Sequence, residues 1–189
     1  MTLAGFPAGV RLTEAELLAF MARRAPGGAL STARKEADAP QIVSGLNDRG
    51  ATCGAPLCAV IPNSDQHSKD YSELADTPRP SHADFTAAVK WGGHADMRGG
   101  GHFSGRLTAP LCVAGGIAKQ ILARKGIHVG AHLASVGTVE DERFPLHPAK
   151  ELFETLAAKE LPTIDEAAGQ AMQAEILAAR ADQDSVGGT

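Results

Sequence analysis

The chain carries the stretch Arg79-Pro80-Ser81-His82-Ala83-Asp84 and, after a predicted helix, the stretch Arg98-Gly99-Gly100-Gly101-His102-Phe103-Ser104-Gly105-Arg106-Leu107-Thr108. These two stretches place fixed cations, histidines and a run of glycines in one short region. Glycines let backbone N–H groups approach an anion closely, and arginines add charge-assisted hydrogen bonds to it. The region therefore predicts a site for a phosphorylated ligand. A flexible turn with solvated arginines is the alternative.

His82 is the candidate proton donor of this region. It lies at the start of a helix expected over residues 81–91, and a histidine can exchange a proton near neutral pH. A surface or capping histidine is the alternative interpretation. His82 and Asp84 could also pair on a metal, but no third ligand has a suitable spacing, so no metal site is predicted.

Composition and charge exclude several classes of protein. The 189 residues are 43% hydrophobic and 21% charged, as in ordinary soluble globular proteins. The sequence has neither a membrane-spanning apolar stretch nor a signal peptide, so a cytoplasmic protein is expected. The formal net charge of -4 argues against nucleic acid as the main partner. Three cysteines fit neither a disulfide framework nor a zinc site and are expected to be buried: Cys53, Cys58 and Cys112.

Hydrophobic periodicity and capping signals predict a mixture of helices and strands. Helices are expected over residues 14–25 after a capping box at Thr13, over 104–125, over 148–159, and over 163–181 from a capping Thr163. Strands are expected over 42–43, 57–61 and 127–136, and the second should be central because it is apolar throughout. In the third, alternation places His128 and His132 on one exposed face. The long polar segment 63–81 is expected to be functional.

Several motifs, taken in order, resemble the chorismate synthase family over almost the whole chain. Residues 5–9 resemble its Gly-x-Pro-x-Gly turn, and residues 23–27 resemble its arginine-rich segment. Residues 79–84 are similar to its Arg-Pro-Gly-His-Ala-Asp signature, and residues 98–108 to Arg-Gly-Gly-Gly-Arg-Ser-Ser-Ala-Arg-Glu-Thr. Further matches lie at 31–38, 42–45, 52–56 and 63–66. Several motifs in the same order and at consistent spacing identify a family far more specifically than a single motif does.

The resemblance implies an α+β fold, the family's β-α-β-α sandwich, here incomplete, with residues 1–189 forming a single partial domain. It implies a lyase of the shikimate pathway of aromatic amino acid biosynthesis, which removes phosphate from 5-enolpyruvylshikimate 3-phosphate to give chorismate. The family uses reduced FMN, and NADPH is a possible reductant of that flavin. A small-molecule substrate and a homotetramer are the implied partners, without nucleic acid or membrane.

The resemblance also implies roles for individual residues. By position, His82 corresponds to the family's catalytic histidine acid. The residues expected to hold anionic groups of the substrate are Arg24, Arg79 and Arg106. The residues expected to line the flavin are His102, Phe103 and Ser104. The usual arginine, serine and glutamate of the glycine-rich signature are replaced by His102, Phe103 and Leu107, and Leu30 replaces a frequent basic residue; we interpret these changes as subfamily variation.

The resemblance leaves out two parts of the family pattern. Family members begin with a strand and a Gly-Glu-Ser-His-Gly motif, whereas Met1-Thr2-Leu3-Ala4 leads straight into the Gly-x-Pro-x-Gly turn. The family's second half is also missing, so an internal fragment with weak or no turnover is expected. A non-catalytic remnant or anion-binding module derived from the family is one alternative. A phosphate-sugar or nucleotide-binding enzyme of another family is a second.

Overall fold

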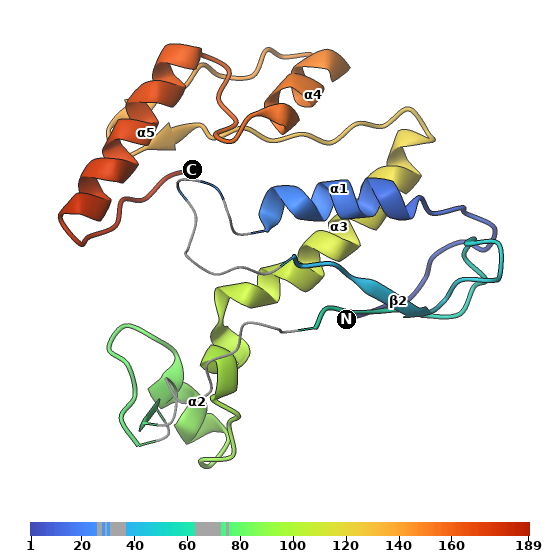
Figure 1. Cartoon of the computed structure of the whole chain (residues 1–189), viewed down its shortest axis with the longest axis horizontal. Helices are drawn as coiled ribbons and strands as arrows, with labels where there is room; N and C mark the ends of the chain where they lie inside the picture. Colours follow the sequence, from blue (N-terminus) through green and yellow to red (C-terminus); the bar gives the residue numbers. More distant parts are fainter. Residues whose placement is uncertain (26–27, 29, 31–36, 63–72, 75) are drawn as a thin grey trace. The chain divides into compact units, whose positions relative to one another are not determined.

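A computed structural model describes residues 1–25, 28, 30, 37–62, 73–74 and 76–189 (Figure 1). The chain divides into two compact units. Unit 1 comprises Met1–Ala25 and Arg34–Ala118, and unit 2 comprises Pro26–Ala33 and Lys119–Thr189. The expected single partial domain over residues 1–189 stays a prediction.

Unit 1 contains a three-stranded antiparallel sheet in the order β1-β3-β2. Its strands are β1 (Thr2–Leu3), β2 (Gln41–Ser44) and β3 (Leu57–Val60). β3 is central, as its apolar sequence predicted, and its Leu57 and Ala59 are buried. Gly45 follows β2 with a φ of 91°, and a side chain there would collide with the backbone of Leu57. Glycine therefore permits the tight turn beside the central strand.

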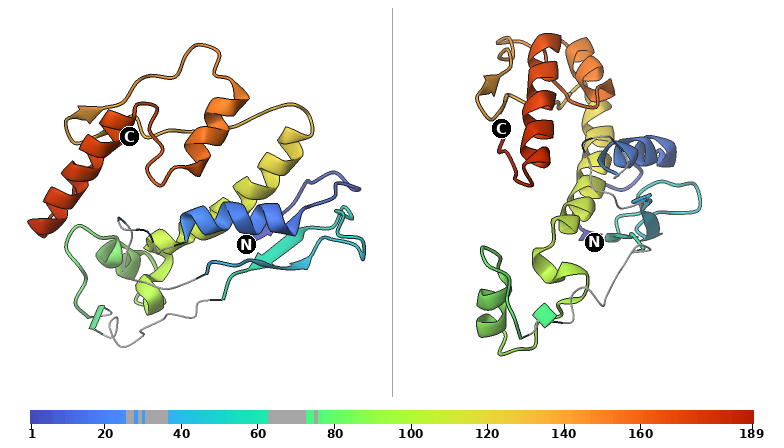
Figure 2. Two further views of the ribbon diagram at one scale, coloured as in Figure 1. Left: turned by 45° about the horizontal axis from the view of Figure 1, so that its top comes forward. Right: turned by 60° about the vertical axis from the view of Figure 1, so that its left-hand side comes forward.

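Two helices of unit 1 pack closely on each other (Figures 1 and 2). α1 (Glu14–Arg24) buries Leu17 and Met21, and α3 (Thr108–Ala123) begins in this unit. A Cβ at Gly116 of α3 would lie 2.8 Å from Leu17 Cδ1, so glycine allows this approach. Pro110 lies in the first turn of α3, where no helical hydrogen bond is lost. The predicted capping box is wrong, because the Thr13 side chain makes no capping hydrogen bond.

The region of residues 79–108 contains three short helices of unit 1. α2 (Asp84–Lys90) starts later than expected, since Ala83 rather than Ser81 is its N-cap residue. The glycine run forms the 3₁₀ helix η2 (Arg98–Phe103), and η3 (Gly105–Leu107) follows it. Ser104 caps η3 by accepting a hydrogen bond from the Arg106 amide at 3.3 Å. The helix expected over 104–125 thus begins as a 3₁₀ turn and becomes α-helical at Thr108.

Unit 2 combines a two-stranded antiparallel hairpin with two helices (Figure 2). The hairpin consists of β4 (Ser135–Val136) and β5 (Val139–Glu140), and the helices are α4 (Lys150–Ala158) and α5 (Glu166–Ala181). The strand expected over 127–136 is wrong except for its last two residues. α5 is capped by Asp165, which accepts from the Ala167 amide at 3.0 Å, whereas Thr163 is buried and does not cap.

These elements confirm the expected α+β class, and several local expectations are corrected or untested. The expected burial of the three cysteines is wrong, because Cys53 is exposed and Cys58 and Cys112 are half-buried; all three are free thiols. In the part of the chain that the structure describes, no helix is both long and apolar enough to cross a membrane. Most of the polar segment 63–81 and of the motif at 31–38 lies outside the described residues.

Candidate functional site

A buried carboxylate organises the first cluster of unit 1. The Asp84 side chain is fully buried at the start of α2 and is held by Arg79 through two parallel contacts. Arg79 Nε donates to Asp84 Oδ2 at 2.7 Å, and Arg79 Nη2 donates to Oδ1 at 3.0 Å. The Arg79 amide also donates to Oδ2 at 3.1 Å. His82 Nδ1 lies 2.7 Å from Asp84 Oδ1. Asp84 thus fixes both Arg79 and His82.

The charge of Asp84 determines how His82 is oriented. The Arg79 hydrogen bonds outweigh burial and hold the pKa of Asp84 far below its usual range, so the carboxylate is ionised and can only accept. The 2.7 Å contact therefore requires a proton on His82 Nδ1. That proton excludes a hydrogen bond from Arg79 Nη2, 3.2 Å away, to the same nitrogen. Nε2 of the partly exposed ring is left to exchange a proton with a ligand.

A second cluster of unit 1 places two arginines on one carboxylate. Asp38, whose side chain is fully buried, is bonded by Arg24 at the end of α1 and by Arg106 Nη2 at 3.4 Å. Arg24 Nη2 also donates to Thr108 Oγ1 at 3.1 Å. Within the described residues, Arg24 Nε is buried and has no hydrogen-bond partner. A buried donor of this kind suits an anion that can accept from it.

Aromatic side chains form a third group in unit 1. Trp91, directly after α2, stacks on Phe103 with ring centroids 5.7 Å apart and an interplanar angle of 26°. His102 lies against the same indole at 6.2 Å, and Lys90 Nζ lies 5.2 Å from its centroid. Trp91 and Phe103 are 37% and 42% exposed. A partly exposed aromatic surface with a nearby cation can receive a planar, anionic ring system.

The seven candidate residues thus fall into three groups, all in unit 1. The structure brings His82 together with Arg79, brings Arg24 together with Arg106, and brings His102 together with Phe103. The Ser104 side chain is engaged in capping η3. Sequence reasoning gave no role to Asp38, although it ends the matched segment 31–38, and missed Trp91, which stands in no motif. It also missed the role of Asp84 as the acceptor that holds Arg79 and His82.

Ser81 carries backbone strain that a single substitution tests. Its φ is 57°, the left-handed region, where a side chain costs about 1–2 kcal/mol. The family signature has glycine here. We expect Ser81→Gly to raise the thermal midpoint by roughly 2–4 °C, because the relief exceeds the added entropy of glycine in the unfolded chain. Ser81→Ala is the matched control, since it retains the Cβ and should give no rise. Equal midpoints for the two variants would contradict strain at this residue.

A buried carboxylate also organises part of unit 2. Asp141 accepts hydrogen bonds from the amides of Ile164 at 2.6 Å and Asp165 at 2.9 Å, and His132 Nδ1 lies 3.0 Å away. Burial opposes ionisation, but the hydrogen bonds outweigh it and lower the pKa of Asp141. The His132 ring also packs edge-on against Phe144 at 4.3 Å. His132 is therefore largely buried and paired, contrary to the expected exposed face.

Comparisons with known proteins agree on one family. The family model described as chorismate synthase matches residues 1–189. The chain is 41% identical to a chorismate synthase of Lancefieldella parvula, over 99% of this chain and 52% of that protein. It is 43% identical to one of Thermococcus kodakarensis, over 97% of this chain and 50% of that protein. The chain thus spans about half the length of the curated relatives it matches.

A solved structure shows the same fold. It is a crystal structure of chorismate synthase, which aligns with a TM-score of 0.68 at 22% sequence identity. The alignment covers 99% of this chain and 51% of the crystallised chain. The fold class expected from the sequence is thereby confirmed.

Proposed function

The chain belongs to the chorismate synthase family, and on that premise we propose that unit 1 binds 5-enolpyruvylshikimate 3-phosphate and assists the elimination of its phosphate to give chorismate. The observation that carries the proposal is the orientation of His82. Its Nδ1 is held by an ionised, buried Asp84, so Nε2 is the nitrogen available to a substrate. Such fixed orientation is what a general acid needs.

The proposed substrate carries a phosphate and carboxylates, and unit 1 offers two arginines for them. Arg24 and Arg106 share one carboxylate, Asp38, and are each about one-fifth exposed. An anion that accepted from Arg24 Nε would satisfy a buried donor that has no partner among the described residues. The proposal gives these two side chains the binding of anionic groups. Arg79 is a positioning residue, because its guanidinium is directed at Asp84.

His82 would act on the leaving group. As the bond from the ring carbon to the phosphate oxygen breaks, His82 donates its Nε2 proton to the departing phosphate. The phosphate then leaves with less negative charge. Asp84 stays ionised and stabilises the charged ring before the transfer. The phosphate leaves with the bonding pair of the carbon–oxygen bond. Overall, a hydrogen elsewhere on the substrate ring leaves as a proton to water, and the electron pair of its C–H bond stays in the new double bond of the ring system, so the reaction has no net redox change. Arg24 and Arg106 hold the substrate while the charge develops.

The proposal includes reduced FMN, which fits the aromatic group of unit 1. The stacked Trp91 and Phe103 present partly exposed ring faces, and His102 adds a polar edge. These side chains would hold the planar ring of the flavin by stacking. When bound, reduced FMN supplies transient electron donation that helps to expel the phosphate. NADPH as the reductant of the flavin and a homotetramer complete the proposal and rest on the resemblance. A cytoplasmic location is added as the default expectation from the sequence.

Substrate binding by the 189-residue chain is the first test, measured by calorimetry with 5-enolpyruvylshikimate 3-phosphate. We expect Arg24→Gln and Arg106→Gln each to weaken binding about tenfold or more, since hydrogen bonds to charged groups are lost. Arg98→Gln is the matched control, because Arg98 is 72% exposed and pairs with the exposed Asp96. Equal affinities for Arg106→Gln and Arg98→Gln would rule out the proposed anion site.

Anaerobic turnover with reduced FMN and the same substrate is the second test. Chorismate formation should depend on the flavin and fall by about 10²–10⁴-fold in His82→Asn. Turnover that is indifferent to His82→Asn would overturn the assignment of the acid. Tight binding without any turnover would instead favour an anion-binding module derived from the family.

A further inference from the structure

The hydroxyl group of Thr108 links two separate segments of unit 1. Thr108 is the first residue of α3. Its Oγ1 accepts a hydrogen bond from Arg24 Nη2 at 3.1 Å and donates one to the Gly105 carbonyl oxygen at 2.6 Å. Arg24 lies at the end of α1, and Gly105 begins η3 next to Arg106. The hydroxyl therefore connects the segments that carry the two arginines of the proposed anion site.

The chemistry of its two ends fixes the direction of this hydrogen-bond chain. A guanidinium group can only donate, and a carbonyl oxygen can only accept. The single hydroxyl proton of Thr108 is therefore directed at Gly105, and an oxygen lone pair is directed at Arg24. Because neither contact can reverse, the Thr108 side chain acts toward Arg24 as an acceptor.

Two different partners hold the two terminal nitrogens of the Arg24 guanidinium. Asp38 accepts from Nη1, and Thr108 accepts from Nη2. One contact would leave the planar group free to turn about it, whereas contacts to two different nitrogens fix its plane. Among the described residues, Nε of the same group is buried and has no hydrogen-bond partner. Asp38 and Thr108 together therefore set the direction of that donor.

We propose that Thr108 is a positioning residue for the substrate anion, because it fixes the plane of the Arg24 guanidinium. This role rests on the proposed function, since it requires Arg24 to bind an anionic group of the substrate. Thr108 acts through Arg24 and does not itself contact the substrate. A guanidinium that is already held in place loses less side-chain freedom when an anion binds, and its affinity for the anion is higher.

Substitution of Thr108 tests this role by calorimetry with 5-enolpyruvylshikimate 3-phosphate. Thr108→Val removes the hydroxyl but keeps the branched shape, and it should weaken binding about three- to tenfold. Thr108→Ser keeps the hydroxyl and should bind within about twofold of the wild-type chain. Thr86→Val is the matched control. Thr86 is also exposed in the first turn of a helix and donates to the carbonyl three residues earlier, that of Ala83, at 3.0 Å.

A double-mutant cycle shows whether Thr108 acts through Arg24. In an Arg24→Gln chain, Thr108→Val should cause no further loss of affinity, because no guanidinium remains to be held. A loss of equal size in both backgrounds would contradict a role through Arg24. If Arg24→Gln weakened binding and Thr108→Val did not, the positioning role alone would be wrong. If neither change weakened binding, the proposed anion site would be wrong as well.

The orientation of Arg24 can also be measured without a ligand. Rotation about its Nε–Cζ bond exchanges Nη1 and Nη2, and ¹⁵N exchange spectra of the side chain give the rate. Thr108→Val should speed this rotation at least about threefold, whereas Thr86→Val should leave it unchanged. A purely structural role for Thr108 would lower the thermal midpoint without any change in this rate. Equal rates in the wild-type chain and in Thr108→Val would overturn the inference.

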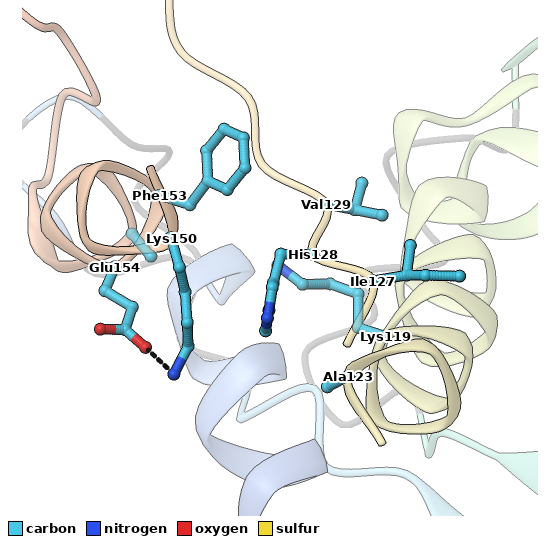
Figure 3. A pocket seen from close by; sticks show the side chains of 9 residues that line it. Lys119, Ala123, Ile127, His128, Val129, Lys150, Phe153 and Glu154 are labelled. Atoms are coloured by element: carbon cyan, nitrogen blue, oxygen red, sulfur yellow. Dashed lines mark ion pairs between the residues drawn. The ribbon is translucent and has the colours of Figure 1, made fainter. Parts of the chain in front are cut away.

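A pocket of unit 2 provides the reference for where the substrate binds. It lies between the last part of α3, the segment that follows α3, and α4 (Figure 3), and its volume is about 160 Å³. Cationic side chains line it, among them Lys150, which pairs with Glu154 at 3.0 Å. In ¹H–¹⁵N spectra the substrate should shift amides near Arg24. Shifts confined to residues 119–129 and 150–157 would place the anion in this pocket and overturn both the positioning role and the proposed anion site.

Discussion

Asp84→Asn is expected to release His82 from its fixed tautomer and to lower the free energy of unfolding by about 2–3 kcal/mol. Asp84 is fully buried and accepts from Arg79 Nε, Arg79 Nη2 and the Arg79 amide. An asparagine can present only one oxygen to these donors, and its NH₂ group would face a cation. The asparagine side chain can either accept from or donate to His82 Nδ1, so it would not fix the proton on that nitrogen.

The tautomer of His82 is measured directly by ¹⁵N correlation spectra of its ring. In the neutral ring of the wild-type chain, Nδ1 should carry the proton, because the ionised Asp84 accepts from it at 2.7 Å. In Asp84→Asn the two tautomers should both be populated. Turnover should fall by about 10²–10⁴-fold, mainly in kcat, since the ionised carboxylate that orients His82 and stabilises its charged ring before the proton transfer would be lost.

The control for this prediction is Asp96→Asn. Asp96 also pairs with an arginine two residues away through several contacts, but both partners are largely exposed. Exposed pairs of this kind contribute little to stability. The control should leave both the thermal midpoint and the His82 spectrum unchanged. A single Nδ1–H tautomer that survived Asp84→Asn would show that another group orients His82.

The sequence predicted those elements that depend on local apolar pattern. The central position of β3 follows from its uninterrupted apolar residues. The close packing of α1 on α3 at Gly116 emerged only from the structure. Capping residues were predicted less well, because Thr163 and Ser81 satisfy the same local pattern as true caps. Thr163 is buried and Ser81 has a positive φ, and neither property is visible in the pattern.

The strand expected over 127–136 failed for a tertiary reason. Alternation of polar and apolar residues predicted it, but His132 pairs with Asp141 and the Leu133 amide donates to the Pro162 carbonyl at 2.8 Å. These long-range bonds satisfy the backbone and side chains without a neighbouring strand. The alternation of polar and apolar residues alone cannot distinguish a paired strand from an irregular segment held by such long-range hydrogen bonds.

The candidate site likewise combines residues that are close in the sequence with residues that only the fold brings together. Arg79, His82 and Asp84 lie within six residues, so their sequence already indicated a charged group with a proton donor. Asp38 and Arg106 are 68 residues apart, and only the fold brings them together. Arg24 and Arg106 were predicted as anion-binding residues from the resemblance, but nothing in the sequence indicates that they share the buried carboxylate of Asp38.

Asp141→Ala should produce the largest loss of stability in unit 2, about 3–5 kcal/mol. The side chain is fully buried and accepts from the Ile164 and Asp165 amides just before α5. Alanine would leave these two donors and His132 without their acceptor. Hydrogen exchange measures the effect locally, since the Ile164 and Asp165 amides should lose protection first. Asp184→Ala, at an exposed acid of the same unit, should leave both amides protected.

The stabilisation by Asp141 should depend on pH with a defined sign. Its pKa in the folded chain lies below the value of about 3.9 for an unfolded aspartate. The contribution is therefore complete above pH of about 4 and is lost as the pH falls through the lowered pKa. Wild-type protection of the Ile164 and Asp165 amides should decline in that acidic range. In Asp141→Asn, which keeps the shape but cannot ionise, protection should be lower at neutral pH and should lack this dependence. A wild-type acid response that persisted in Asp141→Asn would assign it to another carboxylate.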